Sequence, residues 1–324
     1  MSDLPAPTAP ALTVVVPCFN ERDTLGTFHA RLSAVMATIG RTWDVVYVDD
    51  GSGDDTFAVM TQLQAADPHV AIARLSRNFG KEIALTAGLD LSRATEGIVV
   101  IDADLQDPPE VIADLVAAFT DGVDTVYAQR RARTGDSVAK RVTAHLFYRV
   151  MARLGDRVAM PPDTGDFRLI SRRALNALLQ LRERHRFMKG LFAWVGFPAV
   201  AVLYDRAPRA AGRSSFNYWS LWNFALEGIT SFTVWPLKVA TYLGLLVSVL
   251  SVLYGGKIVF GTLLFGNPVP GYPSLMSVIL FLGGIQLMTL GLIGEYLGRI
   301  FNETKNRPLY ILRDAIPSRI DPAA

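Results

Sequence analysis

Residues 99–110 read VVIDADLQDPPE: three apolar residues, followed by aspartates at positions 102, 104 and 107. An apolar run of this kind predicts a strand buried on both faces. Such a strand ordinarily ends in turn-forming residues and not in several negative charges. The stretch therefore raises two questions: which sheet this strand belongs to, and what the carboxylates at its end bind.

Short β-rich runs alternate with helical patterns along the first part of the chain. The predicted strands cover residues 12–17, 44–49, 70–76, 97–103, 124–129 and 200–205, and the predicted helices cover residues 21–39, 54–66, 81–94 and 109–120. Apolar strands separated by helices indicate a parallel sheet covered on both faces. The fold class is therefore α/β, with a Rossmann-like, mostly parallel sheet. Residues 161–175 read as a loop.

Polar residues stand directly after four of these strands. They occupy positions 20–21, 49–52, 77–78 and 102–104. Ligands of parallel α/β sheets bind outside the carboxyl ends of the strands, so these residues are expected to share one site. The Asp49-Asp50-Gly51-Ser52 cluster alone is a weak signal, since Asp, Gly and Ser also form ordinary turns and helix caps.

Asp102 and Asp104 are the sharper signal. If the strand persists through them, their side chains point the same way, about 6–7 Å apart, and repel unless a cation lies nearby. Hard oxygen ligands suit Mg²⁺ or Mn²⁺, and Gln106 adds a neutral oxygen. Asp107 precedes two prolines and has Glu110 three residues later, a pattern that favours a helix N-cap.

Composition and motifs exclude several function classes. The net charge is only +2, so no nucleic-acid partner is expected, and the single Cys18 excludes an intramolecular disulfide framework. The chain has neither the phosphate-binding loop of ATPases nor the Gly-rich dinucleotide motif after its first strand. A bound phosphate would instead meet the metal and cations such as Arg77, Lys81, Arg130 and Arg131.

Residues 237–298 are almost free of charge. Within them, residues 239–256 and 274–294 each meet the roughly 18–20 apolar residues that cross a bilayer. Their connector, residues 266–273, is uncharged, whereas several Lys and Arg residues follow the second span. The positive-inside rule then places both termini in the cytoplasm. A buried hairpin in a soluble core is the alternative interpretation.

Aromatic residues precede the first span. Trp219, Trp222 and Phe224 lie among polar residues, which favours an amphipathic helix on the bilayer surface, with an ordinary packed helix as the alternative. The expected organisation is a disordered tail (1–11), a cytoplasmic α/β domain (12–215), an interfacial helix (216–236), two transmembrane helices (237–298) and a cytoplasmic tail (299–324).

Six motifs together carry a resemblance to a known family. They are VVVPCFNE (14–21), YVDDGSGDDT (47–56), SRNFGKEIALTAGLD (76–90), VVIDADLQDPPE (99–110), GDFRLISR (165–172) and RFMKGLFAWVGF (186–197). In this order, and with a C-terminal pair of membrane spans, the chain resembles the polyprenyl-phosphate glycosyltransferases. These are inverting enzymes of GT-A fold that include bactoprenol glucosyltransferases and dolichol-phosphate mannose synthases. The match covers about residues 12–307, and the SRNFGKE form is closer to the bactoprenol branch.

The resemblance implies a role for each matching position. The base and ribose of a nucleotide sugar would be held by Pro17, Phe19, Glu21 and Asp49, and its phosphates would lie near Lys81. The divalent ion, Mg²⁺ or Mn²⁺, would be bound by Asp102, Asp104 and Gln106. The reaction centre would lie near Asp166, and the acceptor phosphate would be approached by Arg130, Arg206, Arg213 and Ser214. The family's Gly-x-Ser-Lys-Tyr loop reads Gly-Arg-Ser-Ser-Phe at residues 212–216, so Arg213 stands in for the missing lysine.

The expected activity is therefore hexose transfer, with inversion, from a nucleotide sugar to polyprenyl phosphate at an inner cell membrane. UDP-glucose is the favoured donor; GDP-mannose, UDP-GlcNAc, UDP-galactose and an aminoarabinose nucleotide remain open. Relatives also suggest a homo-oligomer. Two other classes stay open: a processive polysaccharide synthase, although its Gln-x-x-Arg-Trp motif is absent from the sequence, and a non-catalytic membrane scaffold.

Overall fold

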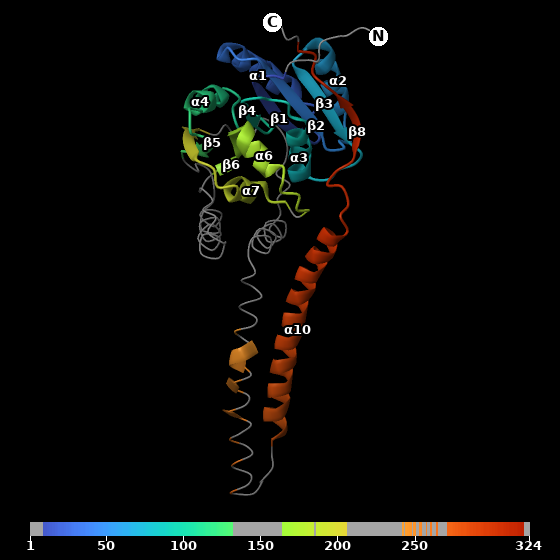
Figure 1. Ribbon diagram of the computed structural model, residues 1–324. Coiled ribbons are helices and arrows are strands. Elements are labelled where there is room, and N and C mark those ends of the chain that lie inside the picture. Colours follow the sequence, from blue (N-terminus) through green and yellow to red (C-terminus); the bar gives the residue numbers. More distant parts are fainter. Residues whose placement is uncertain are drawn as a thin grey trace. The chain divides into compact units, whose positions relative to one another are not determined.

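The computed structural model describes residues 9–131, 164–184, 186–205 and 271–320, with isolated helical positions between residues 242 and 264 (Figure 1). The chain divides into two units, one holding the described residues up to 205 together with 307–320, the other holding the helix that precedes residue 307. Three predicted phosphate contacts (Arg206, Arg213 and Ser214) and the expected interfacial helix lie outside the described residues.

The first unit is built on an eight-stranded sheet in the order β7-β5-β6-β4-β1-β2-β3-β8. The strands are β1 (Leu12–Cys18), β2 (Trp43–Asp49), β3 (Val70–Leu75), β4 (Gly97–Val100), β5 (Thr125–Arg130), β6 (Thr164–Ser171), β7 (Ala199–Tyr204) and β8 (Leu312–Ile316). Strands β4, β1, β2 and β3 are parallel neighbours, as are β5 and β7. The mostly parallel α/β sheet predicted from the sequence is thus confirmed.

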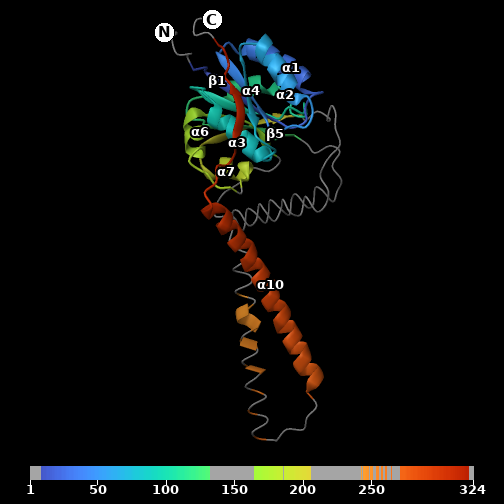
Figure 2. The same cartoon turned by 90° about the vertical axis from the view of Figure 1, so that its right-hand side faces the viewer.

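Helices cover the two faces of this sheet, as Figures 1 and 2 show. On one face α1 (Leu25–Ile39), α2 (Thr56–Ala66) and α4 (Val111–Ala118) pack against alternate residues of the strands in one large apolar core. On the other face lies α3 (Lys81–Leu91), whose Gly88 packs so closely that an added Cβ would stand 2.3 Å from Val15. Burial on both faces explains why these strands read as nearly continuous apolar runs.

The loop prediction over residues 161–175 is wrong for residues 164–175, the part that the structure describes. Residues Thr164–Ser171 form β6, which lies antiparallel between β4 and β5, and α6 (Arg172–Leu178) follows at once. The Ser171 hydroxyl caps α6 by accepting the Ala174 N–H. Gly165, Asp166 and Arg168 break the apolar pattern of the strand, because this end of β6 contributes to a polar site.

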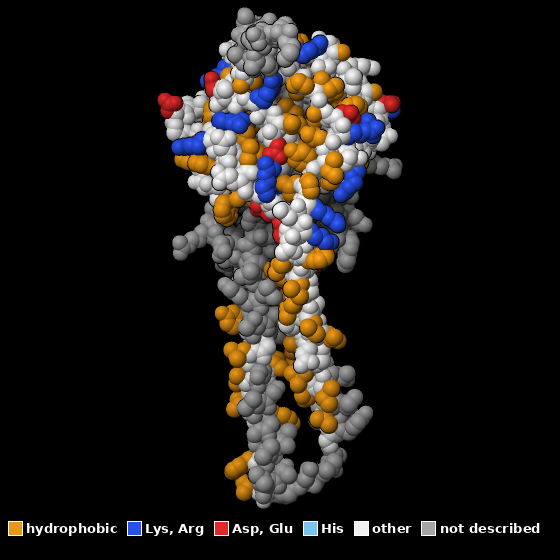
Figure 3. Space-filling view, turned by 45° about the vertical axis from the view of Figure 1, so that its right-hand side comes forward, with side chains coloured by type: hydrophobic (Ala, Val, Ile, Leu, Met, Phe, Trp, Pro, Cys, Tyr) orange, Lys and Arg blue, Asp and Glu red, His pale blue; other side chains and the backbone are white. Residues whose placement is uncertain are grey.

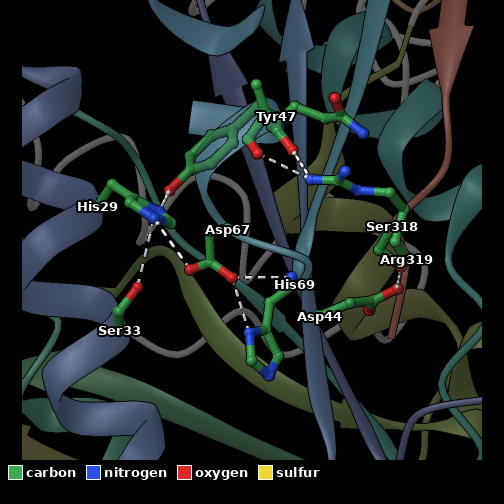
Figure 4. A network of polar contacts seen from close by, with 10 residues as sticks. His29, Ser33, Asp44, Tyr47, Asp67, His69, Ser318 and Arg319 are labelled. Atoms are coloured by element: carbon green, nitrogen blue, oxygen red, sulfur yellow. Dashed lines mark hydrogen bonds and ion pairs between the residues drawn. The ribbon is translucent and has the colours of Figure 1, made fainter. Parts of the chain in front are cut away.

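The C-terminal segment is an edge strand and not an independent tail. β8 pairs antiparallel with β3, and the chain beyond it stays attached to the domain. There the buried Ser318 hydroxyl donates to Asp44 (3.0 Å) and accepts from Arg93 (2.6 Å). Arg319 donates to backbone carbonyls at the end of α2 (Figure 4). Residues after the last apolar helix therefore complete the sheet at its β3 edge.

Figure 4 also shows a buried network beside this edge. His29 of α1 contacts the Tyr47 hydroxyl (2.9 Å) and the Asp67 carboxylate (3.2 Å), and Asp67 accepts the backbone N–H of His69 (2.8 Å). Burial lowers the pKa of His29, and the Asp67 carboxylate opposes that shift. The network fixes α1 against the loop that leads into β3, at the end of the sheet opposite the predicted ligand site.

The second unit contains α10 (Tyr272–Thr304). Within Phe281–Thr304, an 18-residue stretch has a mean hydropathy of 1.2 and none of it is buried. Among the described residues this is the one helix long and apolar enough to cross a membrane. Hydrophobic side chains lie along it in Figure 3. Half of the span predicted over residues 239–256 lies outside the described residues, so the structure does not confirm a pair of spans.

Candidate functional site

A cavity of about 460 Å³ opens at the carboxyl ends of β1, β2 and β4. It is lined by Pro17, Cys18, Phe19, Glu21, Asp50, Asn78, Gly80, Lys81, Ala84, Asp102, Ala103, Asp104, Asp107, Arg130, Gly165, Asp166 and Lys189. This is the edge of a parallel sheet where ligands bind. The sequence argument that four strand ends share one site is therefore matched by the geometry.

Most of the predicted site residues lie in this wall: Pro17, Phe19, Glu21, Lys81, Asp102, Asp104, Arg130 and Asp166. Four described candidates are not part of the wall: Asp49, Gln106 and the two candidate phosphate cations Arg77 and Arg131. Asp49 is fully buried, accepts the Ser52 N–H (2.9 Å) and lies 3.2 Å from the Arg74 guanidinium. Gln106 lies behind Asp104, and its backbone N–H donates to the Asp104 carboxylate (3.0 Å).

Lys81, in the first turn of α3, joins two of the predicted acidic residues. Its ammonium donates to Asp102 (2.7 Å) and to Asp166 (2.9 Å), which come from the end of β4 and from β6. Charge-assisted hydrogen bonds of this kind are stronger than neutral ones. Lys81 therefore fixes the two carboxylates relative to each other, although they are far apart in the sequence.

The ionisation of this triad follows from its contacts. Desolvation acts to lower the pKa of Lys81, but the two carboxylates outweigh it and raise that pKa well above its ordinary value. Burial raises the pKa of Asp102 against the opposing charge of Lys81. Burial acts the same way on Asp166, yet the ammonium groups of Lys81 and Lys189 hold the pKa of Asp166 below its ordinary value. The two carboxylates therefore differ in environment, and ionisation is more strongly favoured at Asp166 than at Asp102.

One carboxylate oxygen of Asp166 is buried without a hydrogen-bond partner among the described residues. This oxygen is Oδ1, whereas Oδ2 accepts from Lys81. Buried polar atoms are nearly always paired, so an orphaned oxygen in a cavity wall indicates a position that a ligand or ion completes.

The chain between β4 and α4 differs from its prediction in two ways. β4 ends at Val100, and Leu105 adopts a φ of 59°, so Asp102 and Asp104 do not extend from one straight strand as the same-face argument assumed. Asp107 is not the cap of α4, because the helix begins at Val111 and the Asp107 carboxylate accepts the Tyr204 hydroxyl. Asp107 is a cavity residue.

Asp50, one of the strand-end residues expected at the site, lines the cavity, although the sequence analysis gave it no role of its own. Its carboxylate accepts the backbone N–H groups of Phe79 (2.7 Å) and Gly80 (2.9 Å), directly before α3. Burial raises the pKa of Asp50, while these two hydrogen bonds oppose the shift. Asp50 therefore holds the start of α3, and with it Lys81, against the end of β2.

Gly51, beside Asp50, is required by the same contact. Its φ is 69°, and an added Cβ would stand 2.5 Å from the Arg77 carbonyl carbon. We expect Gly51→Ala to lower the free energy of unfolding by at least about 2 kcal/mol, since it combines a left-handed backbone with overpacking. Gly53→Ala in the same loop is the control, because nothing lies within 4 Å of its Cβ position. Equal urea-unfolding midpoints for both variants would contradict this account.

Lys189 lines the cavity, and Glu82 of α3 contacts the chain next to it. Lys189 belongs to α7 (Met188–Trp194) and is half-buried in the cavity wall. Glu82 of α3 accepts the Met188 N–H (3.1 Å). Neither residue was a sequence candidate; the only signal was a lysine inside the family-like RFMKGLF stretch.

The pH dependence of stability is expected to carry a contribution from Glu82. Desolvation and the charge of Asp166 raise its pKa to about 7, above the unfolded value, so the folded protein binds the extra proton. This contribution is therefore present at low pH and is lost as pH rises toward about 7. Unfolding free energies measured from about pH 5 to about pH 8 should fall less steeply in Glu82→Gln than in the wild type; parallel curves would refute the assignment.

The cavity wall as a whole is acidic, with six carboxylates (Glu21, Asp50, Asp102, Asp104, Asp107 and Asp166) against three cations (Lys81, Arg130 and Lys189). A ligand carrying a diphosphate would be repelled by this excess unless a cation accompanied it. No three Asp, Glu, His or Cys side chains within the described ranges form a complete metal-binding group. The arrangement thus suits a cation that takes some of its ligands from an anionic substrate.

The mostly parallel sheet and the acidic cavity at its carboxyl edge define an α/β protein with a ligand site at the strand ends. Comparison with known families makes the assignment specific. Residues 13–179 match the model of glycosyl transferase family 2, and residues 235–300 match a model described as the GtrB C-terminal hairpin. The chain belongs to glycosyl transferase family 2.

Several curated proteins are similar over nearly their whole length. An uncharacterised glycosyltransferase of Synechocystis sp. is 50% identical over 303 residues, 94% of this chain and 95% of that protein. A prophage-derived bactoprenol glucosyl transferase of Shigella flexneri is 46% identical over 93% of this chain and 97% of that protein. A prophage bactoprenol glucosyl transferase homolog of Escherichia coli is 43% identical over 93% and 98%.

Proposed function

We propose that this protein transfers a hexose from a nucleotide sugar to polyprenyl phosphate at the cytoplasmic face of the membrane, with inversion at the anomeric carbon. The observation that carries the proposal is the 43–46% identity to proteins named as bactoprenol glucosyl transferases and their homolog, over 93% of this chain. The acidic cavity supplies a site with the chemistry that such a transfer requires.

The donor would occupy the cavity with its base toward β1. Phe19 is 46% exposed at the cavity wall, and an exposed aromatic ring offers a face on which a base can stack. Pro17 and Glu21 lie beside it. Asp49 already accepts the Ser52 N–H and pairs with Arg74. A direct contact between Asp49 and the ribose therefore requires one of these two partners to move aside.

Asp102 and Asp104 would hold Mg²⁺ or Mn²⁺, with Gln106 behind them. Their carboxylate oxygens are the hard ligands these ions prefer, and Mg²⁺ usually completes its shell with waters and substrate phosphates. A bound divalent ion supplies charge stabilisation to a departing diphosphate. The buried, unpaired oxygen of Asp166 and the excess of carboxylates in the cavity wall support the binding of a cation here.

The reaction would be a direct displacement. An oxygen of the lipid phosphate forms the new bond to the anomeric carbon, and the bond from that carbon to the nucleoside diphosphate oxygen breaks with its electron pair leaving on the diphosphate. A phosphate monoester is already largely dianionic at neutral pH, because its second pKa is about 6, so no strong base is required. Asp166, held ionised by Lys81, would position the reactants, and Arg130 would approach the acceptor phosphate.

The membrane-bound arrangement belongs to the same proposal. Two spans over residues 239–256 and 274–294 agree with the hairpin model that matches residues 235–300. They would hold the catalytic domain where the lipid headgroup lies, with both termini cytoplasmic. The helix over residues 216–236, the phosphate contacts of Arg206, Arg213 and Ser214, and assembly into a homo-oligomer remain parts of the proposal.

A donor panel tests the proposed function. Purified protein is incubated with polyprenyl phosphate and, separately, UDP-glucose, UDP-GlcNAc, UDP-galactose, GDP-mannose and an aminoarabinose nucleotide, and nucleoside diphosphate release is measured. We expect release with one donor, UDP-glucose being favoured, only when lipid phosphate is present, and none after EDTA treatment. Absence of release with every donor would favour a non-catalytic scaffold.

A further inference from the structure

Lys189 is the third cation of the cavity wall, beside Lys81 and Arg130. Lys81 is engaged by two carboxylates, and Arg130 lies 3.5 Å from the Tyr204 hydroxyl. The half-buried Lys189 makes no side-chain hydrogen bond or ion pair with residues that the structure describes. Its positive charge acts to lower the pKa of both Asp166 and Glu82. A partly desolvated ammonium that faces a ligand cavity is suited to an anion.

Glu82 fixes the backbone next to this lysine. Its carboxylate accepts the N–H of Met188, the residue preceding Lys189, at 3.1 Å. The fully buried Met188 side chain also contacts the Thr86 hydroxyl of α3 through its sulfur (4.0 Å). The first turn of α7 is thereby attached to α3, the helix that also carries Lys81. Lys81 and Lys189 consequently lie on two helices held at a fixed separation beside Asp166.

We propose that Lys189 binds a phosphate oxygen of the substrate, and that Glu82 is the residue that positions it. This inference rests on the proposed function, since that function brings phosphate groups into the cavity. The phosphate belongs either to the diphosphate of the nucleotide sugar or to the lipid acceptor. Both present the same chemistry to the ammonium, and the experiment separates them.

The test measures binding and not turnover. Affinities for UDP with Mg²⁺, and for a short-chain polyprenyl phosphate, are determined separately by titration calorimetry on the wild type and on Lys189→Met and Lys189→Arg. A charge-assisted hydrogen bond is worth about 10- to 100-fold in affinity. We expect Lys189→Met to lose that factor for one of the two ligands, which identifies the phosphate, and Lys189→Arg to regain most of it.

The matched control removes a cation away from the cavity. Arg41 precedes β2 at the opposite end of the strands, where it pairs with Glu96, so Arg41→Met is expected to leave both affinities unchanged. Unchanged affinities in Lys189→Met would overturn the inference and leave the proposed function standing. If the wild type bound neither ligand, the proposed function and the inference would both be refuted.

The role of Glu82 is tested by a measurement that general destabilisation of the protein would not change, namely which of the two ligands loses affinity. Glu82→Gln keeps an oxygen that can accept the Met188 N–H, whereas Glu82→Ala removes it. We expect Glu82→Ala to weaken the same ligand as Lys189→Met, and Glu82→Gln to restore its affinity. Equal affinities for Glu82→Ala and the wild type, or a loss spread evenly over both ligands in Glu82→Ala, would show that Glu82 does not position Lys189.

Discussion

Asp104→Asn is expected to lower the rate of sugar transfer at least about 10³-fold while leaving the melting temperature nearly unchanged. The substitution removes the negative charge that would hold the divalent ion. It keeps the oxygen that accepts the Gln106 N–H, so the turn after β4 retains its hydrogen bond. Transfer rates and thermal unfolding of the same preparations provide the measurement.

The control for this variant is Asp114→Asn, a change of the same kind at an exposed position on α4. It should be as active as the wild type. An Asp104→Asn protein with full activity would contradict the metal assignment, and one that failed to fold would contradict the local account of the turn.

Lys81→Met has the second large expected effect, on both activity and stability. It leaves the nearly buried Asp166 without the cation that is hydrogen-bonded to it and to Asp102. We expect unfolding to require about 2 kcal/mol less, below the 3–5 kcal/mol typical of a broken buried pair because the Lys81 side chain is 45% exposed. Transfer should fall at least about 100-fold, since the two carboxylates lose their common anchor.

The double variant Lys81→Met/Asp166→Asn separates the two effects. Removing the charge of Asp166 abolishes the repulsion, so urea unfolding should return most of the way to the wild-type midpoint while transfer stays low. If Lys81→Met alone were as stable and as active as the wild type, the triad would have no role in either property.

The central strands could be predicted from sequence because each is a continuous apolar run between helical patterns. β6 could not, because Gly165, Asp166 and Arg168 interrupt its apolar residues. Arg168 is nonetheless buried: its guanidinium donates to the Gly165 carbonyl (2.8 Å) and stacks on Phe192. β8 carries no such run either, since all its residues are exposed and its pairing with β3 joins segments from opposite ends of the chain.

Some residues of the candidate site could likewise be predicted from the sequence, and others could not. The carboxyl-edge rule brought together residues that directly follow strands, such as Glu21, Asp102 and Asp104, because their position depends on the local chain direction. Asp107 and Lys189 depend on distant partners. The Asp107 partner, Tyr204, is 97 residues away, and the local Pro-Pro-Glu pattern favoured a cap instead. Lys189 belongs to α7, whose first residue, Met188, donates its backbone N–H to Glu82 of α3, 106 residues away.

Direct detection of the lipid product tests the central claim most closely. Purified wild-type protein, Mg²⁺, the donor selected by the panel and polyprenyl phosphate are incubated, and the lipid fraction is analysed by mass spectrometry. The account predicts a new lipid heavier by one hexose residue, formed by the wild type and not by Asp104→Asn. Consumption of the nucleotide sugar without any glycosylated polyprenyl phosphate would contradict it.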